Sequence, residues 1–340
     1  MAAADQIVFV QVSDCHIGRI LANRDYSGAI RTAGGSGRSQ PSHDVDLCKA
    51  FVGALDDVRD VTEMAEEAPI RVVMSGDLTA SGDPDEFAVA HSFFRSLWRL
   101  RRSDVSRFEQ EAGLALGDDE YAGVPGNHDN WYGRGWRTSP SYNPNLYPFH
   151  FRKTPWSKVW VSEKRTMRLF LCGIDSNSGL SDTTNRLAKG AIEDEQLKAL
   201  GTGPPPDPNI VTIKAIIVHH SLAYVAPRRK MHALELEAES REALLDAAAA
   251  NGYVAIMTGH THDPHHEPFA RQVNRSTRVV HELRCASTFQ VPPEGTRGFI
   301  VHRIHKVDGG YVWSTLKYAW HDGRFIKEPL SARWNPFPVL

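Results

Sequence analysis

The chain has 340 residues, of which 41% are apolar and 24% are charged, a composition typical of folded globular proteins. Its formal net charge of −2 argues against a polymeric nucleic acid or an acidic membrane surface as the partner. No apolar run approaches the roughly 20 residues that a membrane span needs.

The N-terminus and the cysteines indicate the compartment. Residues 1–6 lack the basic start of a secretory signal and run directly into a strand-like segment. The four cysteines are scattered and form no CxxC pair, so we expect reduced thiols in a cytoplasmic protein. Histidine, with sixteen copies, is the unusual component, and imidazole is the commonest metal ligand in proteins.

The first expected strand, residues 7–12, is a β-branched run that ends in Ser-Asp-Cys-His. Alternate side chains of an extended chain point the same way, so Asp14 and His16 are expected to face one metal ion together. Cys15 then points away and is expected to pack as a small apolar residue. The Gly-, Ser- and Arg-rich residues 20–41 are a loop, lying either over a site or on the surface.

The second block follows an amphipathic helix over residues 47–61. A strand at 70–74 ends in Ser-Gly-Asp, which places Asp77 at its carboxyl end. Strand, helix and strand predict a βαβ unit with parallel strands, whose sites lie at the carboxyl ends. The next helix is predicted from the cap at Asp83 to about residue 100, with Glu86 completing a capping box.

The third block, Val-Pro-Gly-Asn-His-Asp at residues 124–129, follows another strand-like segment. Asn127 offers a neutral carbonyl oxygen to a metal. His128 offers an imidazole that titrates near neutrality, and Asp129 can orient that imidazole. A metal ligand, a proton donor and its orienting group are therefore expected side by side.

Two other segments are candidates for contact with the substrate. Residues 130–160 are rich in aromatic side chains and do not resemble a regular element. They are interpreted either as a substrate-contacting wall or cap that begins with Trp131 and Tyr132, or as a long loop held to the surface by its aromatics. A later loop carries Arg228 and Arg229, which are expected to meet an anionic substrate.

Two further strands deliver histidines at their ends. The long β-branched run 210–218 leads to His219 and His220, and the run 253–258 leads to His260 and His262. His-x-His at a strand end repeats the geometry expected for the Asp-x-His of the first block. Either His219 or His220 fits the fourth block, depending on where the strand ends.

These five ordered blocks resemble the calcineurin-like metallophosphoesterase superfamily over about residues 7–262. The resemblance implies an α/β protein of the α+β type, a four-layer αββα sandwich. In it, helices flank two mixed sheets, and a dinuclear metal site lies at the carboxyl ends of the strands. Residues 1–320 are expected to form one catalytic domain, with 130–160 as its cap or substrate insertion. Residues 321–340 are expected to be a tail that packs on the body or on a partner, which would allow an oligomer.

By motif position, the resemblance assigns one metal ion to Asp14, His16 and His262, the second ion to Asn127, His219 and His260, and a bridging role to Asp77. Oxygen and nitrogen ligands without a thiolate suit Mn, Fe, Zn, Ni or Co. Two such ions would clamp a phosphate and lower the pKa of a bridging water, which then attacks phosphorus in line with the leaving group.

The function expected from the sequence is therefore metal-dependent hydrolysis of a small phosphoester, with His128 as general acid. A phosphodiester of an organic or nucleotide-like compound is preferred, because an aromatic rim suits a substrate with two organic arms. A phosphomonoesterase or a pyrophosphatase with the same core remains an alternative. A non-catalytic metal-binding scaffold on the same fold is the alternative from another class.

Overall fold

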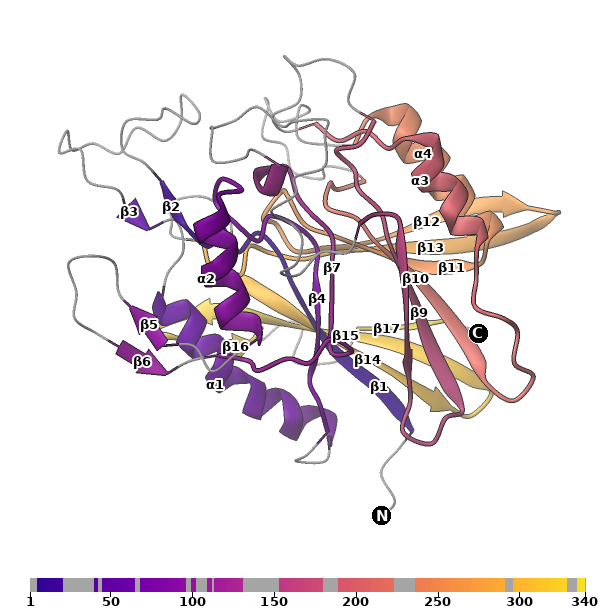
Figure 1. The fold of residues 1–340 in the computed structure, drawn as a ribbon. Coiled ribbons are helices and arrows are strands. Elements are labelled where there is room, and N and C mark those ends of the chain that lie inside the picture. Colours follow the sequence, from indigo (N-terminus) through magenta and orange to yellow (C-terminus); the bar gives the residue numbers. More distant parts are fainter. Residues whose placement is uncertain are drawn as a thin grey trace.

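A computed structural model describes most of the chain, and Figure 1 shows its arrangement. The described residues are 5–20, 40–41, 45–64, 68–95, 99–101, 109–111, 113–130, 153–179, 189–222, 236–290, 296–328 and 335–339.

Two stacked β-sheets form the centre of the molecule (Figure 1). Sheet I has seven strands, in the order β16 (Arg324–Lys327), β15 (Gly310–His321), β14 (Gly298–Val307), β1 (Gln6–Val12), β4 (Arg71–Met74) and β7 (Tyr121–Gly123), and β17 (Asn335–Pro338) also pairs with β15. Sheet II has six, in the order β12 (His265–Val273), β13 (Ser276–Arg284), β11 (Tyr253–Thr258), β10 (Val211–Ile217), β9 (Met167–Gly173) and β8 (Trp156–Val161).

Helices cover the outer faces of both sheets. On sheet I lie α1 (Val45–Thr62) and α2 (Pro84–Arg95), and on sheet II lie α3 (Asp194–Lys198) and α4 (Ala238–Ala250) (Figure 1). The remaining elements are short: the pairs β2 (Arg19–Ile20) with β3 (Gln40–Pro41) and β5 (Arg99–Arg101) with β6 (Glu109–Glu111), and the 3₁₀ turns η1 (His128–Asn130) and η3 (Ala199–Gly201).

The order of layers follows from the alternation of side chains along the strands. In β1, Val8 and Val10 join the apolar cluster shared with α1 and α2, whereas Ile7 and Phe9 join the cluster between the sheets. A third cluster lies between sheet II and α4, where Ile216 packs with residues of that helix. Both faces of each sheet are buried, and the expected four-layer αββα architecture is confirmed.

Parallel pairing places the loops after several strands at the same edge. Strand β1 pairs in parallel with β4, and β4 with β7. In sheet II, β9, β10, β11 and β13 are mutually parallel neighbours. Antiparallel pairs such as β1 with β14 and β8 with β9 make both sheets mixed.

The structure corrects two expectations about secondary structure. The end of segment 130–160 is strand β8, and Trp156 and Trp160 are buried between the two sheets rather than in a wall against a substrate. Trp156 Nε1 donates to the Gly123 carbonyl at 3.1 Å, so this strand end belongs to the core. Residues 131–152 lie outside the described part of the chain. Arg99–Arg101 is strand β5, so α2 (Pro84–Arg95) does not extend to residue 100 as predicted, although Glu86 does accept a hydrogen bond from the Asp83 amide at 3.5 Å.

Gln11 is a polar side chain near the end of β1 with no solvent exposure. Its Nε2 donates within sheet I to Ser75 Oγ at 3.1 Å, and to two carbonyls of sheet II, those of Thr258 at 2.9 Å and Leu283 at 3.2 Å. A buried polar group must find partners, and these partners exist at only one relative position of the two sheets. Gln11 therefore helps to fix how the sheets are aligned.

The same network predicts an acid-sensitive contribution to stability. Trp313 Nε1 donates to His302 Nδ1 at 3.1 Å, so the proton of the neutral ring lies on Nε2, which contacts Gln11 Oε1 at 3.1 Å. Burial, with a smaller contribution from His266, lowers the pKa of His302 to about 3. Below the unfolded-state pKa of roughly 6.5, His302 takes up a proton in the unfolded chain but stays neutral in the folded protein. Stability is therefore lost as the pH falls, by about 1.4 kcal/mol per pH unit for this group.

Between pH 6.5 and pH 5, we expect the free energy of unfolding to fall by about 2 kcal/mol less in the His302→Gln variant than in the wild type, whatever the stability of the variant at neutral pH. Urea unfolding at the two pH values measures the difference. The exposed His321→Gln is the matched control and should behave like the wild type. Identical pH dependence in the wild type and His302→Gln would contradict the assignment.

Candidate metal centre

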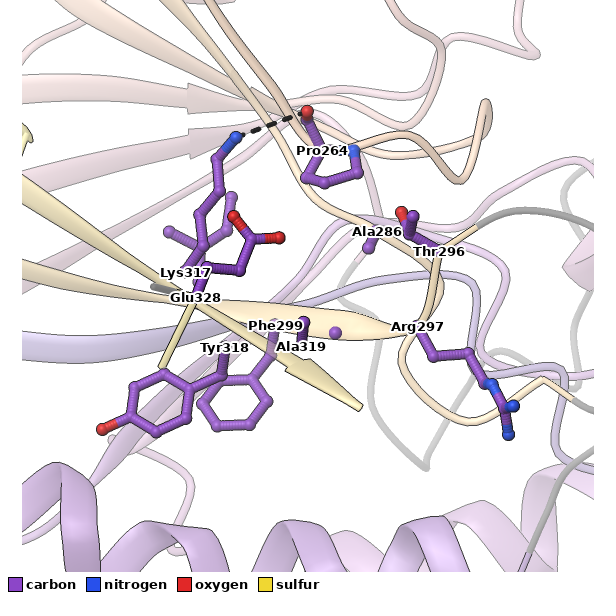
Figure 2. A pocket seen from close by; sticks show the side chains of 11 residues that line it. Pro264, Ala286, Thr296, Arg297, Phe299, Lys317, Tyr318, Ala319 and Glu328 are labelled. Carbon is purple, nitrogen blue, oxygen red and sulfur yellow. Dashed lines mark hydrogen bonds between the residues drawn. The ribbon is translucent and has the colours of Figure 1, made fainter. Parts of the chain in front are cut away.

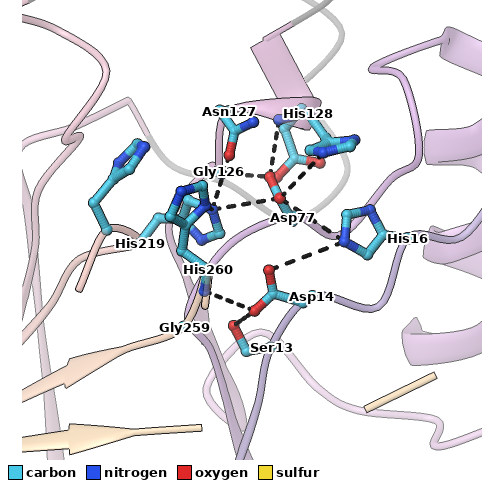
Figure 3. A network of polar contacts seen from close by, with 12 residues as sticks. Ser13, Asp14, His16, Asp77, Gly126, Asn127, His128, His219, Gly259 and His260 are labelled. Carbon is cyan, nitrogen blue, oxygen red and sulfur yellow. Dashed lines mark hydrogen bonds and ion pairs between the residues drawn. The ribbon is translucent and has the colours of Figure 1, made fainter. Parts of the chain in front are cut away.

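Five loops, each following a strand, meet at one edge of the two sheets (Figure 3). Strands β1, β4 and β7 of sheet I lead to Asp14 with His16, to Asp77, and to Asn127 with His128. Strands β10 and β11 of sheet II lead to His219, and to His260 with His262. All seven expected ligands are therefore brought together from both sheets.

The backbone of these loops is strained at the expected ligands. Five of them have φ in the left-handed region: Asp14 at 48°, His16 at 46°, Asp77 at 52°, His260 at 70° and His262 at 58°. Such values cost free energy for residues other than glycine and cluster at functional sites. Hydrogen bonds between the loops maintain them, since the Asp14 amide donates to the Gly76 carbonyl and the His16 amide to the Asp77 carbonyl, both at 3.0 Å.

Two glycines allow the loops to approach each other closely. A Cβ at Gly126 would overlap the Asp77 carboxylate, and one at Gly259 would overlap the side chains of Ser13 and Asp14. Glycine is therefore required directly before Asn127 and directly before His260 for reasons of space.

The two carboxylates each use one oxygen to hold the loops and turn the other toward imidazoles. Asp14 Oδ2 accepts from Ser13 Oγ at 2.6 Å and from the His260 amide at 2.9 Å. Asp77 Oδ1 accepts from the His128 amide at 2.9 Å. Asp77 Oδ2 lies near three imidazole Nε2 atoms, at 3.4 Å from His219, 3.8 Å from His128 and 3.9 Å from His16.

The first cluster of donor atoms surrounds His219. Its Nδ1 contacts the Ser75 carbonyl at 2.8 Å, which fixes a proton there and turns Nε2 toward the site. Around Nε2 lie Asn127 Oδ1 at 3.1 Å, His260 Nδ1 at 3.1 Å and the Asp77 carboxylate. Burial lowers the pKa of His219, but Asp77 outweighs it and raises the value to about 9. A metal ion bound at Nε2 would displace the proton on that atom and leave the proton on Nδ1 in place.

The second cluster contains Asp14, His16 and His262. His262 Nε2 lies 3.2 Å and His16 Nε2 4.0 Å from Asp14 Oδ1. This buried oxygen accepts no hydrogen bond of ordinary geometry within the described residues. Burial lowers the pKa of His16 to about 3, while for His262 the Asp14 carboxylate overcomes burial and raises the pKa. A neutral His16 beside an ionised Asp14 leaves lone pairs for a cation.

The residues present therefore fit a pair of metal ions. Three groups have donor atoms all within 4.8 Å of one another, namely Asp14, His16 and His262; His16, Asp77 and His128; and Asp77, His219 and His260. Asp77 belongs to two of these groups, as a residue shared by two ions would. All donors are imidazole nitrogens or carboxylate oxygens, a set that suits borderline transition metals.

His128 lies at the open side of the site. Its side chain is 26% exposed and that of His262 18%, whereas Asp14, Asp77 and His219 are almost completely buried. Its Nδ1 contacts the Ala80 carbonyl at 2.8 Å, which directs Nε2 into the site. Burial lowers the pKa of His128, and Asp77 together with the Ala80 carbonyl partly opposes this.

The structure gives Asp129 a different role from the expected one. Its Oδ1 accepts from the amide and the hydroxyl of Thr79, both at 2.8 Å, and its Oδ2 from the amides of Leu78 and Gly126 at 3.1 and 2.9 Å. The carboxylate thus joins the loop after β4 to the loop after β7, while the ring of His128 is oriented by Ala80. Burial raises the pKa of Asp129 to about 7.

Three further expectations concern residues near the ligands. His219, not His220, has its Nε2 within the donor cluster, whereas His220 Nδ1 contacts Ser176 Oγ at 2.6 Å. Cys15 is completely buried in the cluster beneath α1, as expected for a packing residue. The expected substrate contacts Trp131, Tyr132, Arg228 and Arg229 lie outside the described residues.

Some supporting groups were not identified from the sequence. The Ser75 and Ala80 carbonyls orient two imidazoles, and backbone oxygens carry no residue-specific signal. Ser13 does carry a signal in the sequence, because this hydroxyl residue directly precedes Asp14. Thr296 Oγ1 donates to the His262 carbonyl at 3.0 Å, and Lys317 Nζ donates to the Pro264 carbonyl at 3.4 Å. Thr296, Lys317 and Pro264 all line one pocket (Figure 2).

No helix in the described part of the chain combines the length and apolar character of a membrane span. Among known proteins, a family model described as calcineurin-like phosphoesterase matches residues 7–264. No curated protein matches the chain.

Solved structures similar to this chain include Vps29 proteins from Entamoeba histolytica. A single mutant of Vps29 has 10% identity and a TM-score of 0.35, and the match covers 97% of this chain and 99% of that one. Wild-type Vps29 in complex with Zn²⁺ has 9% identity and a TM-score of 0.33, with coverage of 98% and 100%.

Proposed function

Because the chain belongs to the calcineurin-like phosphoesterase family, we propose that it hydrolyses a phosphoester with the help of two metal ions. The observation that carries the proposal is the position of Asp77 Oδ2, which lies within 3.9 Å of the Nε2 atoms of His16, His128 and His219. This oxygen lies between two groups of ligands and beside a more exposed imidazole. Such a site has both the donors for two cations and a group able to move a proton.

The ligands divide into two sets around Asp77. We assign Asp14, His16 and His262 to one ion, Asn127, His219 and His260 to the other, and Asp77 to both. Mn, Fe, Zn, Ni and Co all accept this set of donors. When bound, the ions supply charge that stabilises the phosphoryl oxygens and lower the pKa of a water that attacks phosphorus.

His128 is proposed as the general acid. With Nδ1 held by the Ala80 carbonyl, a proton on Nε2 faces the site from its exposed side. Protonation produces an imidazolium that the Asp77 carboxylate and the Ala80 carbonyl both stabilise. Transfer of that proton to the leaving oxygen returns His128 to neutrality. Asp129 contributes indirectly, by fixing the loop that carries His128.

The substrate is proposed to be a small phosphodiester, organic or nucleotide-like. Trp131 and Tyr132 follow His128 within four positions and Arg228 and Arg229 follow His219 within ten, so the sequence places residue types suited to organic groups and anions shortly after two of the ligand blocks. The net charge of −2 favours a small substrate over polymeric DNA or RNA.

Removal and return of metal tests this function. The protein treated with chelator should lose turnover of bis(p-nitrophenyl) phosphate, and added Mn²⁺ should restore it together with about two bound ions per chain by elemental analysis. Faster turnover of p-nitrophenyl phosphate than of the diester would show that the preferred substrate is a monoester. Bound metal without turnover of diester, monoester or pyrophosphate would instead show a non-catalytic scaffold.

A further inference from the structure

Two charged side chains lie completely buried at the end of β13, in a part of the molecule that none of the expected site residues occupies. Glu282 is 0% and Arg284 1% exposed. Arg284 Nη2 donates to Glu282 Oε2 at 3.1 Å, and Nε donates to Oε1 at 3.2 Å. Burying two charges is costly, and such pairs are best attested where they fix one specific arrangement. The other partners of the pair therefore indicate what it arranges.

Glu282 connects two of the loops that carry histidines. Its Oε1 accepts from the Leu222 amide at 3.0 Å and from the Thr258 hydroxyl at 2.8 Å. Leu222 lies three residues after His219, and Thr258 lies two residues before His260. One carboxylate oxygen thus ties the loop after β10 to the end of β11.

Arg284 extends this connection to the residue between two ligands. Its Nη1 donates to Thr261 Oγ1 at 3.4 Å, and Thr261 stands between His260 and His262. Ser221 Oγ lies 3.4 Å from the same hydroxyl and donates to the Gly259 carbonyl at 2.7 Å. The two loops are therefore joined at several points through the buried pair and the hydroxyls around it.

We propose that Glu282 and Arg284 are positioning residues that hold His219 at a fixed distance from His260 and His262, and thereby set the metal affinity of the site. The inference rests on the proposed function, because it takes the three histidines as metal ligands. Hydrogen bonds connect Glu282 and Arg284 to the ligand loops through Leu222, Thr258 and Thr261. Residues that orient ligands in this way typically change metal affinity by about 10- to 100-fold when replaced.

Two variants test the inference by titration of the metal-free full chain with Mn²⁺ in a calorimeter. Glu282→Gln with Arg284→Met removes both charges together, so no charge is left buried alone, and it abolishes the contact with Thr261. We expect its Mn²⁺ affinity to fall by about 10- to 100-fold. Thr261→Val keeps the side-chain shape and removes only the hydroxyl, and we expect a smaller decrease in the same direction. The matched control is Thr62→Val, the same change at a buried threonine in α1, which should bind Mn²⁺ like the wild type.

The outcomes separate this inference from the proposed function. Wild-type Mn²⁺ affinity in the folded double variant overturns the positioning role, and if that variant does not fold, wild-type affinity in Thr261→Val overturns it. Tight Mn²⁺ binding by a wild-type protein that hydrolyses no phosphoester contradicts only the proposed function, since the affinity comparison still decides the role of the pair. A wild-type protein that binds no Mn²⁺ contradicts both.

Discussion

Replacing Asp77 with asparagine is expected to lower kcat by about 10³-fold or more and to reduce the bound metal below two ions per chain. Its Oδ2 faces both ligand groups, and an amide in its place removes the negative charge that two cations would share. Metal ions contribute several kcal/mol of transition-state stabilisation, and each 1.36 kcal/mol corresponds to about tenfold in rate. Turnover of bis(p-nitrophenyl) phosphate and elemental analysis of the same sample measure both effects.

The matched control for this substitution is Asp246→Asn, at an exposed carboxylate that pairs with Arg271. It should retain full activity and metal content. Asparagine at position 77 can still accept the hydrogen bond from the His128 amide, so the loop itself should be preserved. Retention of both ions and of the wild-type rate in Asp77→Asn would rule out the shared-ligand assignment.

Replacing His128 with alanine is expected to leave two metal ions bound and to lower kcat by about 10²–10⁴-fold on a diester with an alkyl leaving group. An alkoxide leaves poorly unless it receives a proton, and Nε2 of the partly exposed His128 is suited to supply it. On bis(p-nitrophenyl) phosphate the loss should be much smaller, because p-nitrophenolate leaves without assistance. Parallel kinetics on the two esters measure the difference.

The surface variant His321→Ala controls for the general effect of removing an imidazole. It should leave both rates unchanged. A His128→Ala protein that hydrolysed the alkyl ester at the full rate would show that His128 is not the general acid. An equal loss on both esters would instead indicate a role in binding the phosphoryl group.

The ordered ligand blocks could be found from the sequence because each is attached to a strand that is easily recognised. The apolar runs before Asp14, Asp77 and His219 are rich in β-branched residues, as buried parallel strands are. Parallel strands end at a common edge, so polar residues at their ends converge whatever the details of the loops. The four layers were expected because the five ordered blocks resemble the calcineurin-like metallophosphoesterase superfamily.

The contacts of individual side chains could not be found in this way. Asp129 was expected to orient its neighbour His128, but its carboxylate turns back to the amides of Leu78 and Thr79, and the Ala80 carbonyl takes its place. A carboxylate accepts from any donor within reach, and which donors are within reach depends on how two loops distant in sequence are packed. A backbone carbonyl has no sequence signature at all.

Segment 130–160 shows the same limit for secondary structure. Trp156 and Trp160 were grouped with the aromatic residues before them, yet they belong to β8 and pack between the sheets. The large apolar surface of tryptophan suits both a substrate-binding wall and a protein core, so the residue type does not distinguish them. The pairing of β8 with β9 places Trp156 and Trp160 in the core.

The sequence by itself determined which residue types stand at the ends of the strands, and hence the chemistry of oxygen and nitrogen ligands beside an imidazole. Tertiary structure decided how these residues meet. Gln11 aligns the two sheets, five ligands adopt left-handed backbone angles, and Glu282 with Arg284 joins two loops from beneath. The physical reason is that ligand types are properties of single residues, whereas distances between ligands arise from contacts among segments far apart in the chain.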